Sequence, residues 1–194
     1  MGIRKWIGTS LLLIGLILVL IPLYYEWEQN KEVAALEQAL KLIEDEQMAD
    51  LASDEDLPLS KQELKDVFHL EIPSINLKQP VLGETTEENL ELGLTQIKGG
   101  QEPGEGNFTI AGHRGYRGDR HFRKLPDVPE GAEVILHAEG EQYIYEVTSI
   151  EIIEATNVEI LEDHTSLTEI TLITCTRDGQ QRIAVKGKLK DKNL

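Results

Sequence analysis

The chain contains a single cysteine, Cys175, at the end of the apolar, β-branched run "EITLITC". Free cysteine is among the residue types that are most often buried, so packing in a core is the first interpretation. Two features favour chemistry. The next residues, "TRDGQQ", have the composition of a turn, which would leave the thiol at the end of a strand, where sites are commonly built. Arg177 and Arg182 are close enough in sequence to stabilise a thiolate.

A second candidate, His113, also ends a β-branched run, "NFTIAGH". Gly112 and Gly115 on either side of it allow the backbone to turn sharply and leave the ring accessible. In isolation, a histidine at a strand end is as often a surface or capping group. Beside a free cysteine, it supplies the acid or base that thiol chemistry requires.

The other histidines give weaker signals. His69 and His137 lie inside strand-like runs, and His164 lies in the acidic segment "LEDHTSLT", where we expect it to be solvated. His113, Asp119 and His121 raise the possibility of a metal site on one glycine- and arginine-rich loop, but their spacing is not specific to metal ligands. The sequence therefore predicts no metal site.

Arginine is the third element of a candidate site, because acyl transfer develops negative charge on the attacked carbonyl oxygen. The turn "TRDGQQ" predicts a hairpin in which Arg182 begins the second strand, opposite Cys175, while Arg177 lies in the turn. We therefore prefer Arg182 for the catalytic role. Thr174 and Arg177, on either side of the cysteine, are candidates for substrate binding.

The elements that must position these residues are predicted to be short β-strands. Repeated β-branched runs bounded by Gly, Pro, Asp or Asn, without regular intervening helices, predict a mainly β fold, either a sandwich or a closed barrel. Proline at position 73 divides the first run into two extended pieces. Thr85 and Glu88 predict a capping box at the start of a short helix. The expected strand runs are 68–82, 107–113, 132–138, 143–153, 169–175 and 182–189.

The N-terminus carries an uncharged run of 17 residues, Ile7–Leu23, near the lower limit for crossing a bilayer. Aromatic residues flank it, and Arg4 and Lys5 precede it, which predicts that the N-terminus is cytoplasmic and that the rest of the chain lies outside. A cleavable signal peptide is the alternative, but no small-x-small cleavage site follows. We expect a cytoplasmic tail at 1–6 and a transmembrane signal-anchor at 7–25.

Residues 26–66 are expected to form an acidic extracellular stalk. Val33, Leu36, Leu40 and Ile43 recur at helical spacing, whereas the following acidic run has no sustained apolar stripe. The stalk is thus expected to be partly helical and then flexible. It would hold the following domain, residues 67–194, off the membrane, although a regulatory role is a second interpretation.

Composition limits the remaining function classes. A net charge of -16 opposes binding to nucleic acid or to anionic lipid headgroups. One cysteine cannot form an internal disulfide. Aromatic residues make up only 5% of the chain, so we expect a core built mainly from Ile, Leu and Val.

Several motifs, taken in their order along the chain, resemble those of the sortases, the cysteine transpeptidases of Gram-positive cell surfaces. The resemblance extends over about 68–189. It rests on "EIPSINLKQPVL", "TEENL", "GEGNFTIAGHRG", "FRKL" and "TLITC", with an arginine a few residues after the cysteine, all behind an N-terminal anchor.

The resemblance implies an eight-stranded sortase-type β-barrel with a catalytic Cys175, His113 and Arg182. It further implies that the enzyme cleaves the C-terminal LPxTG-like sorting signal of a secreted protein. The cleaved protein is then held on Cys175 as a thioacyl intermediate. An amine of a peptidoglycan precursor then takes up the acyl group. Class D is the preferred subclass, with a class A-like enzyme as the alternative. The segment 154–169 would contribute to substrate selection. Some sortases bind calcium, but a solvated loop is the simpler expectation for its acidic residues, and we expect no cofactor.

Two further functions are compatible with the same residues. One is a membrane-anchored cysteine peptidase that only hydrolyses its substrate. The other is a non-catalytic module that holds extended peptides in the same groove. The presence of all three catalytic residue types argues against the second.

Overall fold

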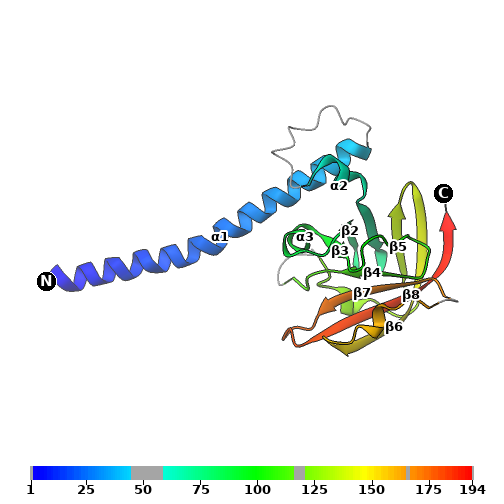
Figure 1. Cartoon of the computed structure of the whole chain (residues 1–194). Coiled ribbons are helices and arrows are strands. Elements are labelled where there is room, and N and C mark those ends of the chain that lie inside the picture. Colours follow the sequence, from blue (N-terminus) through cyan, green and yellow to red (C-terminus); the bar gives the residue numbers. More distant parts are fainter. Residues whose placement is uncertain (1, 45–58, 116–120, 165–166, 194) are drawn as a thin grey trace. The chain divides into compact units, whose positions relative to one another are not determined.

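The computed structural model describes residues 2–44, 59–115, 121–164 and 167–193. The chain divides into two compact units, Met1–Leu59 and Ser60–Leu194 (Figure 1). The second unit begins at Ser60, seven residues before the start of the predicted 67–194 domain, and so includes one short helix more. Of the predicted stalk, residues 45–58 lie outside the described residues.

The first unit contains one long helix, α1 (Gly2–Glu44). It runs without interruption through the predicted anchor and through the helically spaced part of the predicted stalk. Its segment Trp6–Lys41 contains a stretch long and apolar enough to cross a membrane, by length and composition. Apolar side chains from Ile7 to Leu23 are exposed, and beyond them the Lys31 ammonium lies 3.5 Å from the centre of the Trp27 ring. An aromatic residue at this point suits the boundary between lipid and water.

The second unit is a closed eight-stranded barrel, with strand order β1-β2-β3-β4-β7-β8-β6-β5. This confirms the predicted fold class. Most neighbours are antiparallel, but β2 pairs with β3 and β4 pairs with β7 in parallel. The strands are β1 (Phe68–Ile72), β2 (Leu77–Leu82), β3 (Leu94–Gln96), β4 (Asn107–Ala111), β5 (Glu133–Ala138), β6 (Glu141–Glu154), β7 (Glu169–Cys175) and β8 (Gln181–Asn193).

The barrel closes around a core of mainly aliphatic side chains. In β5, Val134, Leu136 and Ala138 are buried and alternate with more exposed residues, as expected for a strand with one face on the core. Tyr145 is a buried polar exception, and its hydroxyl accepts a hydrogen bond from the Gly104 N–H at 3.1 Å. Burial raises the pKa of Tyr145 to about 12, so this hydroxyl stays neutral.

The structure corrects the predicted helix start. The N-cap of α3 (Glu87–Leu92) is Thr86, whose hydroxyl accepts from the Asn89 N–H. Thr85 does not cap the helix. Its hydroxyl instead donates to the Gln96 carbonyl and hydrogen-bonds to Thr95, tying the segment before α3 to β3. The predicted capping box between Thr85 and Glu88 was therefore wrong, because the Thr85 hydroxyl bonds to β3 and the cap is the next residue, Thr86.

The other short helices lie at chain turns. A capping box does occur at α2 (Lys61–Lys65), between Ser60 and Glu63. The single-turn helix η3 (Pro73–Ile75) separates β1 from β2, as the proline predicted. Single turns η4 (Leu125–Asp127) and η5 (Glu159–Leu161) follow β4 and β6.

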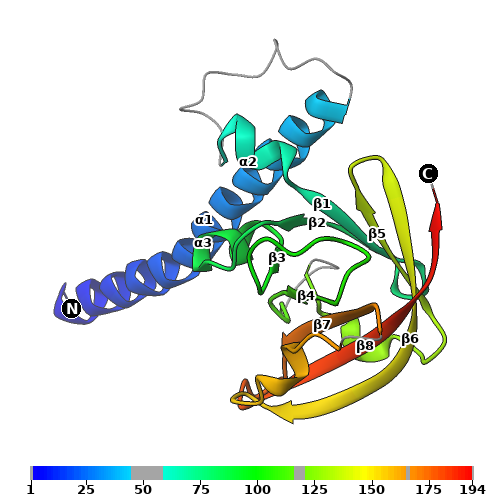
Figure 2. The same cartoon turned by 45° about the vertical axis from the view of Figure 1, so that its right-hand side comes forward.

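Strands β6 and β8 are longer than predicted and pair along most of their length, so that β8 lies between β6 and β7 (Figure 2). The short strand β3 was not predicted from the sequence. It is only three residues long, and its side chains are all buried, so it has no alternating pattern.

Candidate active site

The candidate histidine and cysteine lie at the ends of neighbouring parallel strands, His113 just after β4 and Cys175 as the last residue of β7. The register of β4 and β7 pairs Ala111 with Ile173, and the Gly112 N–H donates to the Ile173 carbonyl at 3.1 Å. Continuing this register by two residues brings His113 level with Cys175. Adjacent strands lie about 4.8 Å apart, so the two residues come together at the same end of the barrel. Both are half-buried.

The exit from β4 is packed too tightly for a side chain at position 112. A Cβ atom added to Gly112 would lie 2.5 Å from Leu94 Cδ2 and 2.8 Å from Phe122 Cδ2. The buried Thr174 hydroxyl donates to the Gly112 carbonyl at 2.9 Å. These contacts fix the two strand ends against each other, directly before His113 and Cys175. A role of Thr174 in binding substrate stays a prediction.

Arg182 lies opposite Cys175 in the β7–β8 hairpin, the arrangement that the turn predicted. Directly opposed residues of antiparallel strands project to the same face. The guanidinium of Arg182 donates from Nη1 to the carbonyls of Gly179 and Gln181, each at 3.1 Å. It therefore rests on the hairpin turn in this structure. A change of side-chain rotamer would free its donors for a substrate oxygen.

The hairpin turn is held by its own side chains. The Thr176 hydroxyl accepts from the Gln181 N–H and donates to Asp178, and Gly179 has a φ of 73°, which suits glycine. The Thr176 hydroxyl and the Gln180 N–H both stabilise the ionised carboxylate and lower the pKa of Asp178. Arg177 is exposed in this turn.

A second arginine contacts the cysteine. Arg114 Nη1 donates to the backbone carbonyl of Cys175 at 3.3 Å. Arg114 directly follows His113, but nothing in the sequence predicted a role for it. Its contact could not be predicted because it depends on the pairing of β4 with β7, which are about sixty residues apart in the chain.

His121 lies beside the candidate histidine. The ring centroids of His113 and His121 are 6.2 Å apart, at an interplanar angle of 79°. From the sequence, His121 was a candidate only as a metal ligand together with His113 and Asp119, and Asp119 lies outside the described residues. Among the described residues, no three His, Cys, Asp or Glu side chains come together in a way that could hold a metal ion.

Comparison with known proteins decides the family. A family model described as the sortase domain matches residues 70–190. The chain belongs to the sortase family. It is 30% identical to sortase A of Bacillus anthracis over 94% of this chain and 92% of that protein. It is 29% identical to sortase D of Bacillus subtilis over 55% of this chain and 52% of that protein.

A solved sortase structure has the same fold. Sortase A of Listeria monocytogenes matches with a TM-score of 0.63 and 27% identity, over 66% of this chain and 90% of that one. The resemblance inferred from the motifs is thereby confirmed at the level of the family. Relatives named sortase A and sortase D both occur, so class D stays a prediction.

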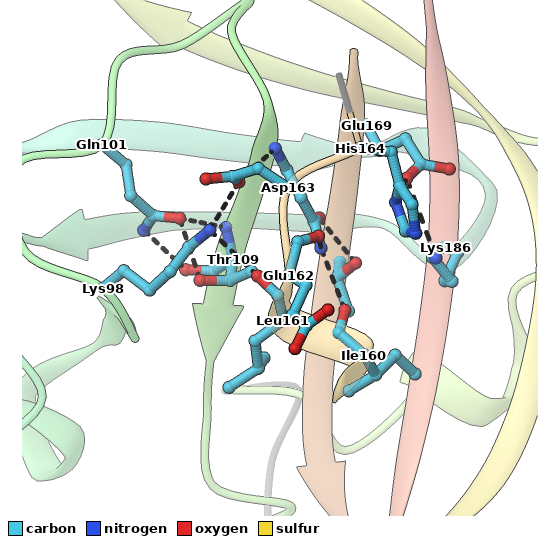
Figure 3. A network of polar contacts seen from close by, with 12 residues as sticks. Lys98, Gln101, Thr109, Ile160, Leu161, Glu162, Asp163, His164, Glu169 and Lys186 are labelled. Carbon is cyan, nitrogen blue, oxygen red and sulfur yellow. Dashed lines mark hydrogen bonds and ion pairs between the residues drawn. The ribbon is translucent and has the colours of Figure 1, made fainter. Parts of the chain in front are cut away.

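In this sortase, the connection from β6 to β7 is fastened to the barrel by a polar network (Figure 3). The Lys98 ammonium donates to Asp163 at 2.7 Å and to the Leu161 carbonyl at 2.9 Å. The same Asp163 carboxylate accepts from the Asn107 backbone N–H, and the Asn107 side chain donates to the Ile160 carbonyl. The start of β4 and the segment after η5 are thus held together.

Lys98 and the Asn107 N–H lower the pKa of Asp163 below its ordinary value of 3.8. The ionised carboxylate is the form that makes these contacts. They are therefore fully present above the ordinary value and are lost as the pH falls through the lowered one. The network remains intact throughout the neutral range.

Three more histidines have ordinary surroundings. His164, which we expected to be solvated, is exposed, but its Nδ1 also lies 2.8 Å from Glu169 Oε2 (Figure 3). His69 and His137 are paired across β1 and β5, and His137 Nε2 lies 3.4 Å from Glu71. His164 contacts Glu169 at the start of β7, at the opposite end of that strand from Cys175.

Proposed function

We propose that this sortase is a membrane-anchored cysteine transpeptidase that cleaves a C-terminal LPxTG-like sorting signal and transfers the protein to an amine of a peptidoglycan precursor. The observation that carries the proposal is the shared register of β4 and β7, which brings His113 level with Cys175. A thiol beside an imidazole, with Arg182 opposite in the hairpin, is the set that acyl transfer through a thioester requires.

In the first step, the proton of the Cys175 thiol is held by His113, having passed to it before or during the attack. Cys175 Sγ attacks the carbonyl carbon of the substrate threonine, and the negative charge passes to the carbonyl oxygen. The C–N bond then breaks, and His113 supplies the proton to the leaving amine. In the second step, the acceptor amine loses a proton to His113 and attacks the thioester, and the C–S bond breaks. Cys175 and His113 return to their starting state. Arg182 stabilises the charged oxygen in both steps.

We also propose that α1 anchors the enzyme by a single span, with the N-terminus in the cytoplasm and the barrel outside. Arg4 and Lys5 precede the apolar run, whereas Glu28 and Glu32 follow it, so the charge asymmetry favours this orientation. The substrates are then secreted proteins that reach the outer face of the same membrane.

Product identity tests the proposal. Full-length protein in detergent is incubated with a fluorogenic LPxTG peptide and an added amine, and the products are separated by mass spectrometry. We expect the amide adduct to exceed the free acid. A free acid alone, at every amine concentration, would identify a hydrolytic peptidase, and bound but uncleaved peptide would identify a non-catalytic module.

The two arginines of the hairpin give a matched pair of variants. We expect Arg182→Ala to lower kcat/KM by about 10²- to 10³-fold, the usual effect of losing one oxyanion donor. Arg177→Ala removes the same charge from an exposed turn position and should change kcat/KM by about twofold at most. Steady-state kinetics at saturating amine measures both. Equal losses in the two variants would remove Arg182 from the catalytic role.

Activity is expected to be unaffected by EDTA and by added calcium. The Lys98 ammonium already neutralises the Asp163 carboxylate and joins the two loops that a cation could otherwise bridge. Inactivation by EDTA with recovery in calcium would contradict this expectation.

The variant Lys98→Met should raise KM by about two- to fivefold, because it loosens the segment 154–169 that we expect to contribute to substrate selection. The effect should be small because the Lys98–Asp163 pair is partly exposed. Lys190→Met removes an ammonium that bonds only to exposed glutamates on the barrel wall and is the control.

A further inference from the structure

We propose that His121 is a positioning residue for catalysis, and that its ring holds the imidazole of His113 in the orientation needed for proton transfer. The inference rests on the proposed function, because it takes His113 as the acid and base. It adds a residue from the far end of the loop that leaves β4, outside the set of Cys175, His113 and Arg182.

The backbone of His121 adopts an unfavourable conformation. Its φ is 53°, in the left-handed region that residues with a Cβ atom rarely occupy. Among the described residues, only Asn76 and Glu139 share a positive φ without being glycine. Asn76 ends the single-turn helix η3, and Glu139 lies in the β5–β6 turn, where such a conformation is common. His121 also lies in a turn, residues 121–124 before η4, so the conformation suits its place in the chain.

Two hydrogen bonds donated by backbone N–H groups hold this turn in place. The His121 N–H donates to Gln79 Oε1 at 3.3 Å, which ties this point of the loop to β2. The next N–H, from Phe122, donates to the His113 carbonyl at 3.0 Å. The loop that leaves β4 at His113 therefore returns to its own starting residue, and His121 arrives next to His113.

The two rings meet edge to face, at 6.2 Å between centroids and 79° between planes. This is a favoured geometry for aromatic pairs and resists rotation of either ring. Below the loop, Phe122 is completely buried in the barrel core, so the position of His121 is fixed from the core. The His121 ring thus packs against the His113 imidazole and limits its rotation.

Ring and backbone effects can be separated by three substitutions. His121→Ala removes the ring and keeps the disfavoured φ, His121→Gly removes the ring and relieves the φ, and His121→Phe keeps a ring edge without an ionisable group. Glu139→Gly relieves the same φ in a turn outside the site and is the matched control. His113→Gln, measured in parallel, tests the proposed function itself.

The measurements are kcat/KM for the fluorogenic LPxTG peptide by full-length protein, thermal unfolding, and ¹H–¹³C spectra of ring-labelled histidine. We expect about a tenfold loss of kcat/KM in both His121→Ala and His121→Gly, since a small misplacement of a catalytic group costs this much or more. The loss should lie in kcat and not in KM. His121→Phe should recover most of it. The His113 ring signals should shift in the alanine and glycine variants.

Results that would overturn the positioning role of His121 can be told apart from results that would refute the proposed function. Unchanged kcat in His121→Gly, with inactive His113→Gln, would overturn the positioning role and leave the proposed function standing. A loss in His121→Phe equal to that in His121→Ala would also overturn it, because an ionisable group and not a ring would then be required. Full activity of His113→Gln would refute the proposed function first.

Discussion

Replacing Cys175 with alanine is expected to abolish thioester formation and to lower kcat/KM for a sorting-signal peptide by at least about 10³-fold. The reason is chemical, because no other thiol exists in the chain and no hydroxyl occupies the same place at the end of β7. Mass spectrometry of the full-length protein mixed with excess peptide should detect the acyl adduct in the parent protein and none in the variant.

The fold should tolerate this change. Cys175 is half-buried at a strand end, so loss of one sulfur atom there should cost about 1 kcal/mol or less. Thermal unfolding gives the comparison, and an unchanged affinity for the peptide would establish that the groove survives. If peptide cleavage by Cys175→Ala remained near that of the parent protein, Cys175 would be a packing residue, the interpretation with which the sequence analysis began.

The barrel was predictable because its strands carry their own signals. The run ending at Cys175 was predicted to the residue, and the proline at position 73 marked the break between β1 and β2. Hydrophobic alternation and turn composition are local properties, so they can be read without knowledge of the partner strand. Closure into an eight-stranded barrel came from the motif resemblance, since the residue pattern alone left a sandwich equally open.

Properties that depend on pairing between distant strands could not be predicted. The sequence suggested that His113 and Cys175 belong together because thiol chemistry needs both and because the motifs resemble those of sortases. The parallel pairing of β4 and β7 supplies the geometric reason. The contact of Arg114 with the Cys175 carbonyl and the contact of His121 with His113 are of the same kind. Each joins residues through a backbone arrangement that no local pattern encodes.

Arg182 is an intermediate case. The turn "TRDGQQ" gave its register opposite Cys175 correctly, because hairpin register follows from the length of the turn. The direction of its side chain toward the carbonyls of Gly179 and Gln181 was not foreseen. Backbone pairing restricts where a long side chain begins, while its end responds to whichever acceptors lie within reach.

The second large effect is expected for His113→Ala, with a loss of about 10²- to 10⁴-fold in kcat/KM, the range for removal of a general acid or base. The loss should be smaller than that of Cys175→Ala, since the thiol remains and water can carry a proton slowly. Both half-reactions should suffer, because the leaving amine needs a proton and the acceptor amine must lose one. Single-turnover acylation and the partition of the acyl-enzyme between amine and water measure the two steps separately.

Alkylation of the thiol shows whether the variant has lost proton transfer or the whole site. Cys175 should still react with iodoacetamide in His113→Ala, because the thiol keeps its position at the end of β7. Its rate at neutral pH should fall if His113 stabilises the thiolate, and should stay unchanged if the resting pair is neutral. His164→Ala removes an exposed histidine whose partner is Glu169 and is the matched control. Equal peptide cleavage by the His113 and His164 variants would contradict the assignment of His113 as the proton carrier.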